Sequence, residues 1–230
     1  MGIQERKERE KERRKEEILD AAQKVFGEKG LTMATVDDIA TAAELSKGTL
    51  YLHFESKEDI YLALMMRGLR LMRSTFEEII SRERSVVRTL YFLECAYTEF
   101  FHRQRYYFRM MNSFRQTNVH KEASEGLREE YAEEGRRNWE QIIKLFQRGV
   151  KEGQVRNDIN PTDMAIIIWS NATSLMTRID RESEMWQKER NIDLSKTLEA
   201  SFHLLMDAIL TPEARLEYET IRKEHGRTLQ

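Results

Sequence analysis

The chain has 230 residues, of which 40% are hydrophobic and 34% are charged, and its formal net charge is −2. This composition is typical of a folded, water-soluble chain and excludes wholesale disorder. The near-neutral balance excludes strong overall attraction to nucleic acid, although a small basic surface can still bind phosphate. The single cysteine, Cys95, excludes an internal disulfide framework and a multi-cysteine zinc site.

Breakers of regular structure are rare, with only 2 prolines and 10 glycines, and no alternating Val/Ile/Thr segments bounded by turns occur. We therefore predict an all-α fold. The first residues, MGIQERKERE, contain no apolar signal core, and the longest apolar run, MAIIIW at 164–169, is too short to cross a bilayer. The expected location is cytoplasmic, with no membrane partner.

The segment 4–17, QERKEREKERRKEE, is nearly all charged, with the two signs interleaved. Glu10 and Arg14 have the i,i+4 spacing of a helical ion pair. One interpretation is a solvated helical extension or frayed arm, and the other is a basic arm that follows DNA. The interleaved glutamates argue against strong DNA binding. The arginines available to such an arm are Arg6, Arg9, Arg13 and Arg14.

Four helices are predicted next. The first is amphipathic and ends between Gly27 and Gly30, and its apolar stripe consists of Ile18, Leu19, Ala22, Val25 and Phe26. Thr35 suits the N-cap of a short second helix, whose first turn contains two aspartates. Ser46 suits the N-cap of a third helix, and Ser56 with Asp59 resembles a capping box for a fourth.

The segment SKGTLYLHF at 46–54 has two apolar positions spaced as anchors, Leu50 and Phe54, and its other side chains are expected to face solvent. Gly48 lowers helix stability by about 0.5–1 kcal/mol relative to alanine, and it allows a DNA backbone or base edge to come close. Short helices joined by a tight turn, with such a face on the last of them, are typical of a helix–turn–helix that enters the major groove.

In these residues the chain resembles the TetR family of bacterial transcriptional regulators. The resemblance covers about residues 12–65. It is carried by Gly30, Thr35-Val36, Asp38-Ile39-Ala40, Ser46-Lys47-Gly48-Thr49-Leu50-Tyr51, His53-Phe54 and Ser56-Lys57-Glu58. It implies DNA contacts from Thr35, Ser46, Lys47, Gly48, Thr49, Tyr51, His53 and Lys57. By their chemistry, Tyr51 and His53 can donate to phosphates, and Lys47 can reach a phosphate or a guanine edge.

The organisation that follows is an N-terminal arm and three-helix DNA-binding domain in residues 1–56, and a larger helical ligand-binding and dimerisation domain in residues 57–230. The family usually has glycine in the turn where this chain has Glu44. If that position requires a positive φ, the glutamate carries a modest strain.

The fourth helix is predicted to begin at Lys57 and to continue past Met72, and six more helices follow it. Pro161 and Pro212 suit the first turns of two of these six. The expected ranges of the six are 85–101, 104–114, 119–151, 161–181, 194–210 and 212–225.

The resemblance implies a homodimer joined by two helices from each protomer, which reads two half-sites about 34–36 Å apart. Candidate interface residues are Met164, Ile168, Leu175, Leu198, Phe202, Leu205, Met206 and Ile209. Aromatic and methionine side chains also suit the wall of an apolar pocket. Candidate ligand-binding residues are Phe92, Cys95, Tyr107, Phe108, Met111, Trp139, Ile143, Phe146, Trp169 and Met176. Ordinary core packing remains the alternative for both sets.

An enzymatic function has one candidate feature, the E-x-x-H pair of Glu99 and His102. Carboxylate-bridged di-metal bundles need this pair twice and two further glutamates. No other histidine in the sequence has a glutamate three positions before it, and no phosphate-binding loop or nucleophile elbow occurs. We therefore expect no enzyme, no catalytic residue, no cofactor and no metal site.

The resulting hypothesis is a homodimeric, ligand-responsive transcriptional repressor. It binds a (pseudo)palindromic operator through residues 46–53 and is released by a small hydrophobic or aromatic effector. Its partners are double-stranded operator DNA, a second copy of the chain and an effector of unknown identity. The alternative is a ligand-independent helical DNA-binding protein, such as a nucleoid or cell-division factor. A filled C-terminal core favours that alternative, whereas an aromatic-walled cavity favours the sensor.

Overall fold

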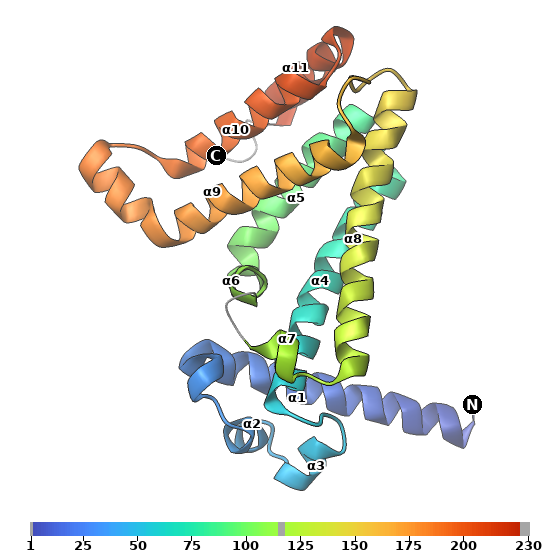
Figure 1. The fold of residues 1–230 in the computed structure, drawn as a ribbon, viewed down its shortest axis with the longest axis vertical. Coiled ribbons are helices and arrows are strands. Elements are labelled where there is room, and N and C mark those ends of the chain that lie inside the picture. The colour runs from blue at the N-terminus through green and yellow to red at the C-terminus, as the bar shows by residue number, and fades with distance from the viewer. Residues whose placement is uncertain (1, 115–117, 226–230) are drawn as a thin grey trace. The chain divides into compact units, whose positions relative to one another are not determined.

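The structure, a computed structural model, describes residues 2–114 and 118–225. These residues form eleven helices and no strand, so the predicted all-α fold is confirmed (Figure 1). The helices are α1 (Ile3–Met33), α2 (Val36–Ala42), α3 (Lys47–Tyr51), α4 (Lys57–Arg82), α5 (Val86–Arg103), α6 (Arg105–Ser113), α7 (Val119–Glu122), α8 (Glu125–Lys151), α9 (Pro161–Arg190), α10 (Leu194–Ile209) and α11 (Pro212–His225).

The chain divides into two compact units. Unit 1 comprises Met1–Arg70 and Tyr106–Gly135, and unit 2 comprises Leu71–Arg105 and Arg136–Gln230. Helices α4 and α8 contribute residues to both units. The expected domain boundary after residue 56 stays a prediction, because unit 1 adds α6, α7 and parts of α4 and α8 to the first three helices.

Unit 1 is built on the apolar stripe of α1. All five predicted stripe residues are buried, which confirms the predicted amphipathic helix. Phe26 packs edge-on against Tyr61 of α4, with ring centroids 5.2 Å apart. The helix runs to Met33, three residues beyond its predicted end, although Gly30 inside it has φ 71° and a non-helical backbone. The predicted break at Gly30 therefore appears as a kink, followed by one further turn.

The turn between α2 and α3 has the geometry of a Schellman motif. The N–H of Leu45 donates to the carbonyl of Ala40 at 2.9 Å, and the N–H of Glu44 donates to that of Thr41 at 3.1 Å. Glu44 has φ 55°, a left-handed conformation that glycine adopts without strain. The suspicion that Glu44 occupies a glycine position is therefore confirmed.

Replacing Glu44 by glycine should stabilise the protein. The left-handed conformation costs an L-residue about 1–2 kcal/mol, and the added freedom of glycine in the unfolded chain takes back about 0.4–1 kcal/mol. We expect Glu44→Gly to raise the free energy of unfolding by about 0.5–1 kcal/mol, measured by urea denaturation. Ala42→Gly, at an exposed helical position two residues away, should lower it by a similar amount. Equal losses in both variants would contradict strain at Glu44.

The first turn of α4 is fastened to its neighbours in unit 1 by a buried carboxylate. The N–H of Asp59 donates to Ser56 Oγ at 3.0 Å, as the predicted cap requires. Asp59 Oδ1 accepts the N–H of Ser124 at 2.7 Å, and Oδ2 accepts the N–H of Glu55 at 3.3 Å. This bond to Ser124 explains one error of prediction. The segment 119–151 is two helices, α7 and α8, because Ala123 is extended (ψ 153°) and Ser124 bonds to Asp59 instead of continuing α7.

Arg67 joins three helices of unit 1. Its guanidinium donates to Tyr107 Oη of α6, and to Asp20 Oδ1 and Gln23 Oε1 of α1, each at 2.7 Å. Next to it, a Cβ added at Gly68 would lie 2.7 Å from the ring of Tyr107. The glycine therefore allows α4 and α6 to approach closely.

Unit 2 packs α5, α9, α10 and α11 with the later part of α4 and most of α8. A backbone bond from the N–H of Arg156 to the carbonyl of Ile209, 2.9 Å long, ties the α8–α9 connection to the end of α10. Pro161 and Pro212 begin α9 and α11 as predicted. Helix α9 is nine residues longer than expected and ends at Arg190, with Asn191 as its C-cap at φ 53°.

Candidate functional site

Helix α3 is held by its two predicted anchors. Leu50 and Phe54 are buried, with 1% and 6% of their surface exposed. Burial of each such side chain contributes about 1.5–3 kcal/mol, which fixes a helix of only five residues. On its outer side Lys47, Gly48 and Tyr51 are exposed. The scaffold therefore leaves a polar helical face open to a partner.

Helices α2 and α3 are short, and side-chain caps stabilise their N-termini. Thr35 Oγ1 accepts the N–H of Asp38 at 3.1 Å, and Asp38 Oδ2 accepts the N–H of Thr35 at 3.0 Å, which completes a capping box. Ser46 Oγ accepts the N–H of Thr49 at 3.1 Å. The hydroxyls of Ser46 and Thr49 also contact each other at 2.8 Å. These bonds orient the hydroxyls at the N-terminus of α3, where they can meet phosphates or base edges.

Lys47 does not stand alone on this face. Its Nζ donates to Asp37 Oδ2 of α2 at 3.0 Å, and this bond raises the pKa of Lys47. Both side chains are exposed, so solvent screens the pair and it contributes little to stability. Its importance is local, because a carboxylate lies where a phosphate would otherwise meet the ammonium group.

Removing that carboxylate should strengthen DNA binding. Asp37→Asn leaves the ammonium of Lys47 without its competing partner and removes one charge that repels phosphate. We expect roughly 3- to 10-fold tighter binding to duplex DNA of any sequence, measured by fluorescence anisotropy at 150 mM salt. Glu129→Gln, an exposed position on α8, changes the net charge equally and should leave the affinity within about twofold. An unchanged affinity of Asp37→Asn would contradict a DNA contact of Lys47.

The last two predicted DNA contacts are partly enclosed. His53 is half-buried, and its Nδ1 has no hydrogen-bond partner in the described structure. Burial lowers the pKa of His53, and nearby Lys15, Lys11 and Arg14 lower it further. Lys57 Nζ donates to the carbonyls of Leu31 and Ala34 at 2.9 and 3.1 Å. The Lys57 ammonium thus fastens the start of α4 to the last turn of α1 and to the residue that follows it.

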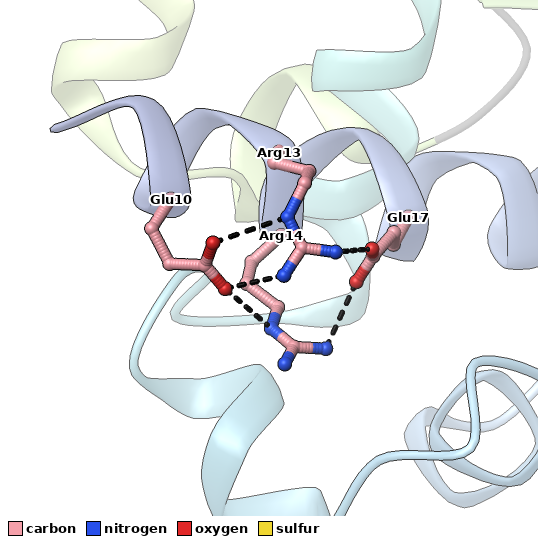
Figure 2. A network of polar contacts seen from close by, with 4 residues as sticks. All are labelled: Glu10, Arg13, Arg14 and Glu17. Carbon is pink, nitrogen blue, oxygen red and sulfur yellow. Dashed lines mark hydrogen bonds and ion pairs between the residues drawn. The ribbon is translucent and has the colours of Figure 1, made fainter. Parts of the chain in front are cut away.

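The charged arm is the helical first part of α1. Figure 2 shows Arg13 and Arg14 lying between Glu10 and Glu17, with Arg13 paired to both carboxylates and Arg14 Nη1 2.9 Å from Glu17 Oε2. The bond from Arg13 lowers the pKa of Glu10. Because these pairs are exposed, solvent screens them and each contributes little to the stability of the helix. DNA contact by the arm stays a prediction.

Unit 2 contains a small apolar cavity, which we call the inner cavity. Its volume is about 70 Å³. Tyr97 and Trp169 stack on one side of it, with ring centroids 4.5 Å apart. The wall is formed by Phe76, Leu90, Leu93, Glu94, Tyr97, Ile142, Phe146, Ala165, Ile168, Trp169, Ala172, Phe202 and Met206.

A larger groove, which we call the outer groove, lies between α5, α10 and α11 and has a volume of about 840 Å³. Polar and charged side chains form much of its wall. Its residues are Tyr91, Glu94, Cys95, Thr98, Glu99, His102, Arg103, Ser195, Leu198, Glu199, Phe202, Glu219, Arg222 and Lys223. Glu94 and Phe202 belong to both walls, so the inner cavity and the outer groove adjoin.

Glu94 is the one acidic side chain in the wall of the inner cavity. Its Oε2 accepts a hydrogen bond from Tyr218 Oη of α11 at 2.9 Å. Burial raises the pKa of Glu94 to about 7, against the opposing effects of the Tyr218 bond and of Arg222. Burial also raises the pKa of neighbouring Cys95 to about 11, which keeps that thiol protonated at neutral pH.

The predicted ligand-binding residues lie in both units. Phe146 and Trp169 line the inner cavity, and Cys95 lines the outer groove. Four others belong to unit 2 but to neither wall: Phe92, Trp139, Ile143 and Met176. The remaining three belong to unit 1: Tyr107, Phe108 and Met111. Ligand binding by any of these residues stays a prediction.

The predicted interface residues lie mostly inside unit 2. Met164, Leu198, Phe202, Met206 and Ile209 are buried within the single chain. Ile168, Phe202 and Met206 line the inner cavity, and Leu198 lines the outer groove. The large exposed apolar side chains of the same two helices are instead Ile166, Ile167 and Met185 of α9 and Leu204 of α10, with 46%, 51%, 44% and 70% of their surface exposed.

Sequence reasoning missed the face of α5 that lines the inner cavity. Leu90, Leu93, Glu94 and Tyr97 have the i, i+3, i+4, i+7 spacing of one helical stripe. A glutamate inside an apolar stripe is the signal that could have identified this face, because such a residue is seldom buried without a partner.

None of the helices within 2–114 and 118–225 combines the length and the apolar character that a bilayer crossing requires. In the same ranges, no three His, Cys, Asp or Glu side chains lie together as a metal site requires.

Comparison with known proteins matches the helix–turn–helix segment to a known family. Residues 18–64 match the family model of "Bacterial regulatory proteins, tetR family". The transcriptional repressor KstR2 of Rhodococcus jostii is 40% identical over 68 residues, which are 30% of this chain and 33% of that protein. The transcriptional activator FasR of Mycolicibacterium smegmatis is 35% identical over 79 residues, 34% of this chain and 33% of that protein. The chain thus matches about a third of the length of these curated relatives.

The fold extends the likeness over most of the chain. The regulator FadR from Bacillus subtilis, solved in complex with stearoyl-CoA, superposes with a TM-score of 0.62 over 83% of this chain and 96% of that chain, at 20% identity. The helix–turn–helix of this chain is thus similar to that of the TetR family of bacterial transcriptional regulators, and the chain as a whole shares the fold of the solved regulator FadR.

Proposed function

We propose that the chain is a homodimeric transcriptional regulator, and specifically a repressor that binds a (pseudo)palindromic operator through residues 46–53 of each protomer. The observation that carries this proposal is the exposed face of α3, Lys47, Gly48 and Tyr51, held over buried Leu50 and Phe54. The match of residues 18–64 to the tetR family model supports it, as does the repressor activity named for KstR2.

A second copy of the chain supplies the second reading helix. A single helix–turn–helix makes few base contacts, and a two-fold dimer reads half-sites about 34–36 Å apart. Exposed Ile166, Ile167 and Leu204 on α9 and α10 support a four-helix interface between protomers. The two helices are already joined within the chain by the bond from Asn171 Nδ2 to Ser201 Oγ, 2.9 Å long.

A small effector in unit 2 releases the operator in this proposal. The aromatic-walled inner cavity and the adjoining outer groove favour a sensor over a DNA-binding protein without a ligand. A 100-fold loss of operator affinity requires about 2.7 kcal/mol of coupling, and the operator must weaken effector binding by the same factor. The bound ligand named for FadR shows that a protein of this fold binds an amphiphile.

Selection of bound duplexes from a random-sequence DNA pool tests the proposal. We expect enrichment of one palindrome whose two halves are one helical turn apart, and native mass spectrometry should show two protomers on each duplex. The triple variant Lys47→Ala, Thr49→Ala, Tyr51→Ala should enrich nothing. Recovery of no sequence motif by the wild-type protein, or of one protomer per duplex, would overturn the proposal.

A further inference from the structure

The junction of the inner cavity and the outer groove is built around one carboxyl group. Glu94 and Phe202 form part of both walls, so a ligand group in either space can lie beside the Glu94 side chain. On the cavity side this carboxyl is surrounded by apolar and aromatic groups, such as Leu93 and Tyr97. A charge in such a place is costly unless a partner offsets it.

Within the described residues, the carboxyl group of Glu94 has one hydrogen bond, from Tyr218 Oη to its Oε2. The nearby cations are bound elsewhere. Arg222 lies 3.2 Å from Glu199 and 3.6 Å from Glu219, and Arg103 lies 3.0 Å from Glu99. No ion pair joins Glu94 to a cation in the part of the chain that the structure describes, so its other oxygen remains available to a ligand.

The charges of the outer groove favour a cationic ligand over an anionic one. They come from the three helices that form its wall: Glu94, Glu99, His102 and Arg103 on α5, Glu199 on α10, and Glu219, Arg222 and Lys223 on α11. Four carboxyl groups therefore face three permanent cations. Arg103 pairs with Glu99 and Arg222 pairs with Glu199. Each pair cancels one charge of each sign, so two carboxyl groups, Glu94 and Glu219, remain against the single cation Lys223.

The size of the inner cavity limits the apolar end of the ligand. Its volume of about 70 Å³ is well below the ~150 Å³ of an apolar protein cavity that takes up benzene. A short alkyl end fits this space, whereas a fused ring system does not. The rest of a longer molecule has the outer groove, about 840 Å³ in volume, available to it.

We propose that unit 2 binds a small cationic amphiphile of the alkylammonium class, with its ammonium group on the carboxylate of Glu94 and its alkyl end in the inner cavity. Tyr218 keeps the carboxylate in place, and the stacked rings of Tyr97 and Trp169 provide apolar contact. That such a ligand also changes DNA affinity rests on the proposed function, whereas its binding does not.

A ligand series of constant chain length tests the charge preference. Hexylamine, hexan-1-ol and hexanoate carry charges of about +1, 0 and −1 at pH 8, since an alkyl amine titrates near lysine. We expect isothermal titration calorimetry on the wild-type protein to show at least tenfold tighter binding of hexylamine than of hexan-1-ol, and the weakest binding for hexanoate. Equal affinity for the amine and the alcohol, or tighter binding of hexanoate, would overturn the proposal.

A matched pair of variants tests the position of the ammonium group. Glu94→Gln keeps the size of the side chain and removes its charge, so hexylamine should lose at least tenfold in affinity while hexan-1-ol changes by less than threefold. Glu99→Gln removes a charge from the same helix and the same groove, and should leave hexylamine binding within threefold. An equal loss in both variants would show general electrostatic attraction and would contradict a site at Glu94.

The pH dependence gives an independent measurement on the unaltered protein. With a pKa of about 7, the ionised fraction of Glu94 falls from about nine-tenths at pH 8 to about one-tenth at pH 6. Hexylamine affinity should therefore fall about tenfold between pH 8 and pH 6, and the affinity of Glu94→Gln should not change. A pH dependence that persists in Glu94→Gln would assign the effect to another group and overturn the proposal.

The two proposals can fail separately. Amine binding without an enriched operator would leave this inference standing and would overturn the proposed function. An operator bound by a protein that shows no preference for hexylamine would do the opposite. If both hold, hexylamine at saturation should weaken operator binding in the wild-type protein but not in Glu94→Gln.

Discussion

Tyr51→Ala should weaken DNA binding by roughly 30- to 150-fold without destabilising the protein. Tyr51 has 49% of its surface exposed and is assigned to a phosphate, a contact worth about 1–1.5 kcal/mol. A two-fold dimer loses this contact twice, which amounts to about 2–3 kcal/mol, and each 1.4 kcal/mol corresponds to a factor of ten. Fluorescence anisotropy with an operator duplex and with a scrambled duplex measures both affinities.

The ratio of the two affinities identifies what Tyr51 contacts. A phosphate contact carries no sequence information, so both duplexes should lose affinity by the same factor. Tyr51→Phe is the matched variant, because it keeps the ring and removes only the hydroxyl that donates to the phosphate. We expect it to reproduce most of the loss. A loss restricted to the operator would show that Tyr51 contacts a base.

Lys47 should behave differently if it reads a base edge. Lys47→Ala would then lower operator affinity more than affinity for the scrambled duplex, and the sequence preference would relax at one position of each half-site. The bond of Lys47 to Asp37 provides a second way to separate a phosphate contact from a base contact. If Lys47 contacts a phosphate, Asp37→Asn should strengthen binding to every DNA sequence.

Local chemistry made the reading helix predictable from the sequence. Thr35 and Ser46 are caps whose bonds reach only three residues along the chain. Leu50 and Phe54 are four positions apart, which is the spacing of residues on the same side of a helix. Even the left-handed turn at Glu44 was indicated by the position of glycine in the family. The caps and the anchors depend on neighbours in sequence, so cap chemistry and periodicity were sufficient for them, whereas the turn was indicated by the resemblance to the family.

Features that depend on distant residues were not predictable. The break at Ala123 and Ser124 results from Asp59, 65 positions earlier in the chain. The wall of the inner cavity combines α4, α5, α8, α9 and α10, and no periodicity shows which apolar stripe meets which. For the same reason the sequence does not show that Phe202 and Met206, which are predicted at an interface between protomers, line the inner cavity; their part in an interface stays a prediction.

The exposed side of α9 and α10 then becomes the better candidate for the dimer interface. Leu204 of α10 and Ile167 of α9 have 70% and 51% of their surface exposed. The two helices are joined by the bond from Asn171 Nδ2 to Ser201 Oγ. Such a patch is typical of a surface that a partner covers.

Leu204→Arg should convert the dimer into a monomer. At a two-fold interface each substitution occurs twice, so two cations are placed among apolar side chains of α9 and α10. We expect the dimer dissociation constant to rise at least ~100-fold, or about 2.7 kcal/mol, while the thermal midpoint of the folded monomer is retained because the side chain is exposed. Light scattering coupled to size-exclusion chromatography measures the mass.

Leu216→Arg is the control that gives this result its meaning, because Leu216 of α11 is equally exposed, at 73% of its surface, and lies outside the α9–α10 face. It should leave both the dimer and operator binding intact, whereas Leu204→Arg should lose operator affinity because two half-sites are no longer bound by one particle. Dissociation caused by Leu216→Arg alone would move the interface to α11. A dimer that survives Leu204→Arg would exclude the α9–α10 face, and the spacing of the two reading helices would then have to be set by another surface.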